Sequence, residues 1–173
     1  MEKRGHSQRT GKRRKERRKN AGTRKERGGM RSERWNEVMG DSRYLAYVVY
    51  FNRDRDYFEC HEMMEELWLE NGRSSLLQGL LQAAVGLHHW DNGNRSGAVK
   101  LMTAALEKLG AHDGDVALGL DLAALRRSLE ESLEALDRRP LDAPFRAFEL
   151  HIVDEGLRVA AERWSEERRL EAE

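Results

Sequence analysis

Residues 74–90, SSLLQGLLQAAVGLHHW, are apolar on nearly every side when they are wound into a helix. Leu, Ala and Val fill most positions between 76 and 87, so this helix would have no broad polar face to turn toward water. A helix of this kind is stable only where neighbouring helices cover it. The stretch therefore predicts the central helix of an all-α domain. The side chains expected to be almost fully buried are Leu80, Leu81, Ala84 and Val85.

The sequence on both sides of this helix repeats apolar residues at helical spacing, and no stretch shows sustained strand-like alternation. Further helices are expected at residues 42–52, from a cap at Asp54 or Asp56 to Glu70, and at residues 96–109, 121–137 and 154–169. The first of these could also pass for a strand, although nothing nearby would pair with it. Residues 111–119 are expected to form a loop, and residues 145–153 are ambiguous between extended and helical. We expect a single small bundle of five to six helices, with a core domain at 40–137 and a partly helical C-terminal extension at 138–173.

The formal net charge of zero hides two oppositely charged parts. Met1 to Arg34 contains fifteen Lys and Arg against four Asp and Glu, about +11, and the remainder contains sixteen against twenty-seven, about −11. Residues 1–34 are almost free of apolar side chains, so we expect a disordered basic arm. Clustered cations release counterions from nucleic acid, and the residues that would contact it are Lys12, Arg13, Arg14, Lys15, Arg17, Arg18 and Lys19. The alternatives are a solubilising tail, or a true translation start at Met30 or Met39.

No apolar run is long enough to span a bilayer, and the arm lacks the apolar stretch of a secretory signal. The single cysteine, Cys60, excludes an intramolecular disulfide and a zinc site made of cysteines alone. We therefore expect a cytoplasmic protein with no membrane partner. A homo-oligomer with Trp90 or Trp164 at its interface is a further alternative.

Polar side chains that could form a site occur in YFECHEMMEELW, residues 57–68. His61, Glu65 and Trp68 are spaced i, i+4 and i+7, which places them on one face of a helix. Burying an imidazole and a carboxylate is unfavourable unless each finds a partner. We expect both to be buried beside Trp68 and hydrogen-bonded to the central helix, whose nearest polar residues are Gln78, Gln82 and His88 or His89. Glu62 and Glu66 are expected to be solvated.

Two interpretations of this polar cluster remain open. A His and a carboxylate one turn apart can hold a divalent metal if another helix supplies a third ligand, so His61 and Glu65 are the candidate ligands. HEMME has Glu where the HExxH zinc proteases have their second His, and this argues against a protease of that type. The cluster could instead hold a small polar ligand. In the other interpretation it is a purely structural hydrogen-bonded network, and the protein is an interaction module whose basic arm contacts nucleic acid.

FNRDRDYFECHEMMEELW followed by LLQGLLQAAVGLHHWDNGNRSGA resembles a family known as domain of unknown function 309. The family's HxxxExxW motif is matched by His61, Glu65 and Trp68. Its second block is matched by Gln78, Gly79, Gln82, His88, Gly93, Asn94, Gly97 and Ala98. The resemblance covers about Tyr44 to Leu109 and implies a small all-helical domain without an established activity. It also favours His88 over His89 as the inward histidine.

Overall fold

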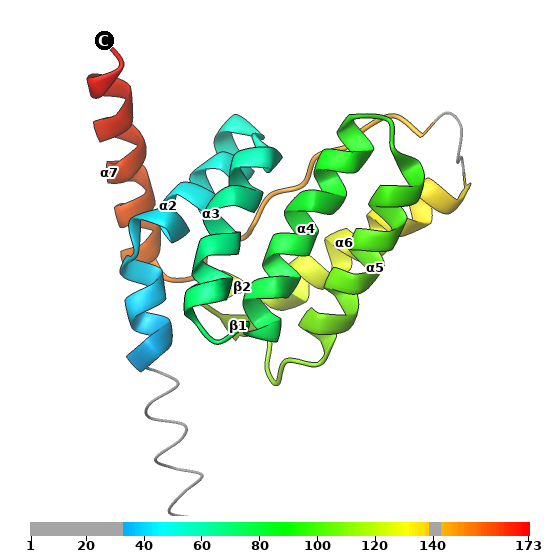
Figure 1. Cartoon of the computed structure of the whole chain (residues 1–173), viewed down its shortest axis with the longest axis horizontal. Coiled ribbons are helices and arrows are strands. Elements are labelled where there is room, and N and C mark those ends of the chain that lie inside the picture. Colours follow the sequence, from blue (N-terminus) through cyan, green and yellow to red (C-terminus); the bar gives the residue numbers. More distant parts are fainter. Residues whose placement is uncertain (1–32, 139–142) are drawn as a thin grey trace, which may run out of the picture. The chain divides into compact units, whose positions relative to one another are not determined.

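The structure is a computed structural model that describes residues 33–138 and 143–173, and most of these residues are helical (Figure 1). The helices are α2 (Ser42–Val49), α3 (Tyr57–Glu70), α4 (Ser75–Asp91), α5 (Arg95–Gly110), α6 (Leu122–Arg138) and α7 (Glu155–Glu171). Residues 33–40 are also helical, and a π-helix, η1 (Tyr50–Asp54), directly follows α2. Residues 38–173 form one compact unit. The expected disorder of the basic arm falls mostly on residues 1–32, which the structure does not describe, and it is wrong for Glu33 and Arg34, which are helical.

Helix α4 lies between α3 and α5, as the sequence predicts for a central helix (Figure 1). Leu80 and Ala84 are fully buried. The prediction is wrong for Leu81 and Val85, which are only half-buried. They share a stripe of α4 with Gln78 and other half-buried polar residues, because the neighbouring helices cover the remaining faces of α4 more completely.

Two glycines allow α4 and α5 to approach closely. A Cβ atom on Gly86 would lie 2.6 Å from Cγ of Met102, and one on Gly79 would lie 3.0 Å from Leu109. Glycine within a helix costs roughly 0.5–1 kcal/mol relative to alanine. The close contact between the two helices accounts for its presence here.

A small β-hairpin is an exception to the all-α prediction. Strand β1 (Val116–Ala117) pairs antiparallel with β2 (Leu120–Asp121), in the region where a loop is expected. Leu118 and Gly119 form the turn with φ of 52° and 72°, which is the backbone region that two-residue hairpin turns require. Strands of two residues are too short to produce an alternating pattern, so the sequence does not reveal them.

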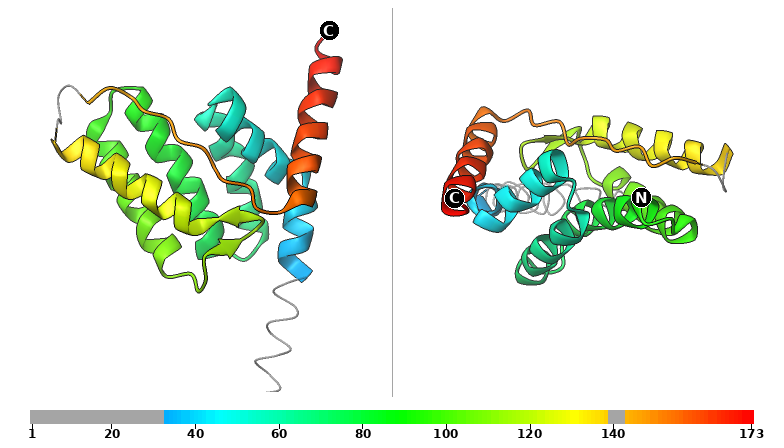
Figure 2. Two further views of the ribbon diagram at one scale, coloured as in Figure 1. Left: turned by 180° about the vertical axis from the view of Figure 1, so that it is seen from behind. Right: turned by 90° about the horizontal axis from the view of Figure 1, so that it is seen from above.

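The ambiguous segment at residues 145–153 is extended rather than helical, and it runs back from the α6 side to the start of α7 (Figure 2). Ile152 forms an isolated antiparallel bridge with Leu120. Phe148 packs on Phe51, and Phe145 contacts Tyr57. Since α7 then packs against α2, the chain beyond residue 143 belongs to the same compact unit as the core.

The two tryptophans considered for an oligomer interface differ in exposure. Trp90 is 5% exposed, so it offers little surface to a second copy. Trp164 is half-buried, with the ring of Tyr50 edge-on at 5.8 Å and the guanidinium of Arg168 over its own ring at 5.0 Å. A homo-oligomer remains a prediction. Among the described residues, no helix is both long and apolar enough to cross a membrane.

Candidate metal-binding site

Helix α3 positions the side chains of the HxxxExxW motif. Asp56 caps its first turn by accepting a hydrogen bond from the backbone N–H of Glu59 at 3.2 Å. The residues of α3 that are buried follow helical spacing and are Tyr57, Cys60, Met64 and Leu67. His61 and Glu65 each follow one of these buried residues, so they are rotated about 100° from the buried stripe. This rotation explains why the predicted burial of His61 and Glu65 is wrong: their side chains are 33% and 45% exposed.

The His61 ring lies between two carboxylates of its own helix. Its Nδ1 is 3.2 Å from Oε1 of Glu62, and its Nε2 is 3.4 Å from Oε2 of Glu65. One ligand atom from each of the three residues can be chosen so that all lie within 4.8 Å of one another. From the sequence, Glu62 is expected to be solvated, and its contact with His61 is not predicted. Adjacent residues point in different directions on a helix, but the glutamate side chain is long enough to reach back to the imidazole.

The hydrogen-bond donors and acceptors around the His61 ring do not match. A neutral imidazole has one N–H donor and one acceptor nitrogen, whereas a carboxylate only accepts. With a carboxylate facing each ring nitrogen, neutral His61 can donate to one of them and must place its lone pair toward the other. A cation between that nitrogen and the carboxylate removes this repulsion, so a metal ion would satisfy both groups.

The central helix does not supply the hydrogen bond expected for His61 and Glu65. Among the described residues, neither makes a hydrogen bond with Gln78, Gln82 or His88. The predicted network between the two helices is therefore wrong as a set of direct contacts.

Two polar atoms of the predicted cluster are buried without a hydrogen-bond partner among the described residues. They are the Trp68 Nε1, which is a donor, and the Gln82 Oε1, which is an acceptor. Trp68 does contact a cation, since the guanidinium of Arg73 lies 5.6 Å from the centre of its ring. Beside the cluster of His61, Glu62 and Glu65, two buried polar atoms thus have no hydrogen-bond partner among the described residues.

The two histidines at the end of α4 face different helices. The His88 ring lies 6.1 Å from Phe58 of α3, and Phe58 lies 6.5 Å from His61. The other histidine, His89, has its Nδ1 3.3 Å from Nδ2 of Asn94, at the start of α5. Both rings are half-buried. Partial burial and the neighbouring His88 lower the pKa of His89, which favours its neutral form.

Comparison with known proteins assigns the chain to a family. Residues 44–101 match the model of a family described as domain of unknown function (DUF309). The uncharacterized protein YpuF of Bacillus subtilis (strain 168) is 37% identical over 124 residues, which cover 68% of each chain. This chain is a member of the DUF309 family. An uncharacterized protein of Aquifex aeolicus (strain VF5) is 30% identical over 99 residues, covering 56% of this chain and 29% of that protein.

Much of the second DUF309 block has a structural explanation. Asn94 caps α5 by accepting a hydrogen bond from the Gly97 N–H at 3.0 Å. A Cβ on Gly97 would lie 2.6 Å from Nδ2 of Asn94 and 2.9 Å from Cγ of His89. Gly93 has a φ of 76°, in the left-handed region where glycine is favoured. These residues shape the α4–α5 turn, whereas the packing of the helices does not explain the polar side chains of His61 and Glu65.

Proposed function

We propose that the outer face of α3 binds a divalent transition-metal ion through His61, Glu62 and Glu65. The proposal rests on the placement of one imidazole and two carboxylates with ligand atoms within 4.8 Å of one another. All three ligands come from the same helix, so little ordering of the chain accompanies binding. A carboxylate–imidazole set suits zinc and also manganese or iron, whereas calcium and magnesium prefer oxygen ligands alone.

The partial exposure of the cluster gives the ion access from solvent. Side chains that are 33%, 48% and 45% exposed can change rotamer to close around an ion without disturbing the core. Three protein ligands leave a coordination position open for water or a small ligand, as in catalytic rather than structural zinc sites. Exposed acidic groups also cluster without binding ions, so the test must separate binding at these three ligands from binding at other carboxylates.

The test is a thermal unfolding series on chelator-treated full-length protein at pH 7.5 with zinc or manganese. Metal that binds only the folded state stabilises it by about 2.7 kcal/mol at one hundred times Kd, which raises the thermal midpoint. Glu62→Gln and Glu65→Gln should each abolish most of this rise. Glu59→Gln is the matched control, because it removes a carboxylate of α3 that has no ion pair with His61. An unchanged midpoint in metal, or an equal rise in all four proteins, would exclude the site.

A second proposal concerns nucleic acid, and the charge asymmetry supports it. The excess of about eleven positive charges in residues 1–34 is large enough to bind phosphates without sequence specificity. In the full-length chain, replacing the seven basic residues between positions 12 and 19 with Gln should weaken binding to single-stranded RNA. It should also reduce the slope of log affinity against log salt concentration. Equal slopes for the two proteins would contradict a role for the arm.

We also propose a cytoplasmic location for the protein.

A further inference from the structure

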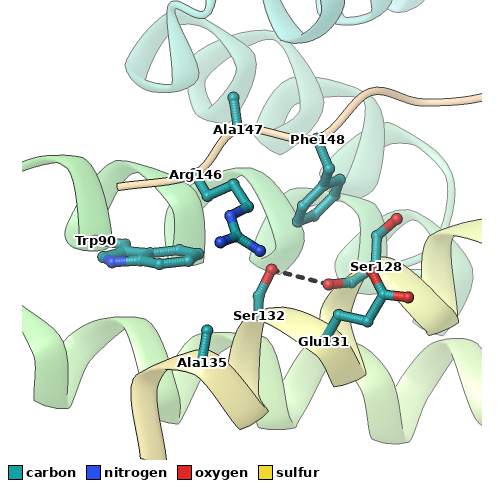
Figure 3. Close-up of a pocket in the computed structure, with 8 residues that line it drawn as sticks. All are labelled: Trp90, Ser128, Glu131, Ser132, Ala135, Arg146, Ala147 and Phe148. Atoms are coloured by element: carbon teal, nitrogen blue, oxygen red, sulfur yellow. Dashed lines mark hydrogen bonds between the residues drawn. The ribbon is translucent and has the colours of Figure 1, made fainter. Parts of the chain in front are cut away.

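A hollow separate from the α3 cluster lies between α6 and the extended segment, beside Trp90 (Figure 3). Its volume is about 120 Å³. Trp90, Glu131, Ala135 and Arg146 also line a second space of about 430 Å³. We call the two spaces together the Trp90 hollow. The second space is also lined by the apolar residues Ala143 and Pro144.

The aromatic walls of the Trp90 hollow are held in place by contacts within the protein. Trp90 Nε1 donates a hydrogen bond to the carbonyl oxygen of Ala143 at 3.2 Å. The Trp90 ring also packs edge-on against Phe145, with 5.7 Å between the ring centres. Phe148, which lines the smaller space, packs on Phe51 in the core. A ligand would therefore meet ring surfaces that are already fixed.

Ser132 supplies a hydrogen-bond acceptor inside the smaller space of the hollow. Ser132 is 6% exposed, and its hydroxyl donates a hydrogen bond to the carbonyl oxygen of Ser128 at 2.8 Å. With its proton engaged, the Ser132 oxygen can only accept from a ligand.

Two charged side chains of the hollow have no partner in the part of the chain that the structure describes. In Figure 3 the guanidinium of Arg146 points from the extended segment toward Ser132, with Trp90 on one side and Phe148 on the other. Arg146 and Glu131 each line both spaces, and neither forms an ion pair or a side-chain hydrogen bond with any described residue. Glu134 and Arg138, by contrast, neutralise each other at the rim. Within the described ranges 33–138 and 143–173, the hollow therefore presents one unpaired positive and one unpaired negative charge.

We infer that the Trp90 hollow binds a free α-amino acid with an apolar side chain. The ligand's carboxylate would pair with Arg146, whose planar fork suits bidentate binding of a carboxylate. Its ammonium group would face Glu131 and the acceptor oxygen of Ser132. The apolar side chain would touch the small exposed part of Trp90 and extend toward Ala143 and Pro144 in the larger space.

The pair of free charges selects this class of ligand over simpler ones. A ligand with only a carboxylate would leave the charge of Glu131 without a partner beside it. A ligand with only an amine would be repelled by Arg146. A zwitterion would satisfy both groups, and its apolar side chain would occupy the larger of the two spaces.

The test uses isothermal titration calorimetry on the full-length protein with L-phenylalanine and L-leucine. Two analogues of phenylalanine serve as probes of the charges: 3-phenylpropionate lacks the ammonium group, and phenethylamine lacks the carboxylate. We expect at least one of the two amino acids to bind, and each analogue to bind at least tenfold more weakly than L-phenylalanine. In parallel, the indole N–H resonance of Trp90 should shift on addition of the amino acid.

Variants assign the binding to this hollow. Arg146→Gln and Glu131→Gln should each weaken amino-acid binding at least tenfold. Arg146→Lys should weaken binding less, because it keeps the positive charge. Arg127→Gln is the control, because Arg127 is an exposed arginine of α6 outside the hollow. Both charged residues are themselves exposed, so the variants should fold, which circular dichroism would verify. No binding at millimolar amino acid, binding unchanged in Arg146→Gln, or an analogue as tight as the amino acid would overturn the inference.

Discussion

The side-chain amide of Asn52 forms two hydrogen bonds with the backbone of Leu150. Asn52 Nδ2 donates to the Leu150 carbonyl oxygen at 2.9 Å, and the Leu150 N–H donates to Asn52 Oδ1 at 2.7 Å. The amide thus satisfies both backbone groups of a residue that has no neighbouring strand at that position. Because Asn52 belongs to η1, this contact connects the extended segment to the core.

Asn52→Ala should destabilise the protein by about 1–3 kcal/mol, since it leaves a partly buried donor and acceptor of Leu150 without protein partners. Asn52→Asp should cost at least as much, because it keeps the acceptor for the Leu150 N–H but turns a second carboxylate oxygen toward the Leu150 carbonyl oxygen. Urea unfolding monitored by circular dichroism measures both values. An alanine variant within half a kcal/mol of the parent protein would show that the extended segment is held by its aromatic contacts alone.

Gly86→Ala should destabilise the protein by about 1–3 kcal/mol even though alanine is the better helix former. The new methyl group would lie 2.6 Å from Met102 Cγ and 3.3 Å from the Met102 backbone nitrogen. Gly110→Ala is the matched control, because a Cβ there meets nothing within 4 Å. The control should be neutral or slightly stabilising in the same urea titration. Equal effects of the two substitutions would contradict close packing of α4 on α5.

Leu80→Ala should cost about 2–5 kcal/mol, the range for large-to-small changes at a fully buried position. Leu81→Ala should cost clearly less, because Leu81 is only half-buried. Chemical denaturation of the two variants compares adjacent leucines that differ in burial. A larger loss at Leu81 would mean that another element covers the half-exposed stripe of α4.

Tyr57→Phe should leave the stability at pH 7 unchanged or raise it by up to about 1 kcal/mol, because the Tyr57 hydroxyl is buried without a partner among the described residues. Burial raises the pKa of Tyr57 to about 12. The unfolded chain therefore loses this proton at lower pH than the folded chain does, and stability falls as pH rises from about 10 to about 12. The phenylalanine variant should lose less stability over that interval in thermal unfolding scans. A variant with the same alkaline loss as the parent protein would contradict this role for Tyr57.

The sequence was sufficient to predict the helices that carry the core. Residues 74–90 are apolar at almost every position, and the capping and turn residues around α4 and α5 mark helix boundaries within one or two residues. Helix α3 was likewise predictable, from a cap at Asp54 or Asp56 to Glu70, and the structure places the cap at Asp56. The β-hairpin and the π-helix could not be predicted, since each contains too few residues to produce a period.

The candidate sites were only partly predictable, because they depend on side-chain reach and on distant segments. Helical spacing correctly brought His61 and Glu65 together, but it could not show that Glu62 reaches back to the same ring. The Trp90 hollow combines residues from α4, α6 and the extended segment. No local pattern links Trp90 to Arg146, so the structure was required to find them together.

The measurement that tests the proposed metal site most directly is paramagnetic broadening by Mn²⁺ in the NMR spectrum of the full-length protein. Broadening falls steeply with distance, so it identifies the residues nearest the ion. At substoichiometric Mn²⁺ we predict loss of signal centred on His61, Glu62 and Glu65, and Glu65→Gln should abolish it. Broadening centred on another part of the chain, or spread evenly over the acidic surface, would contradict a metal site on α3.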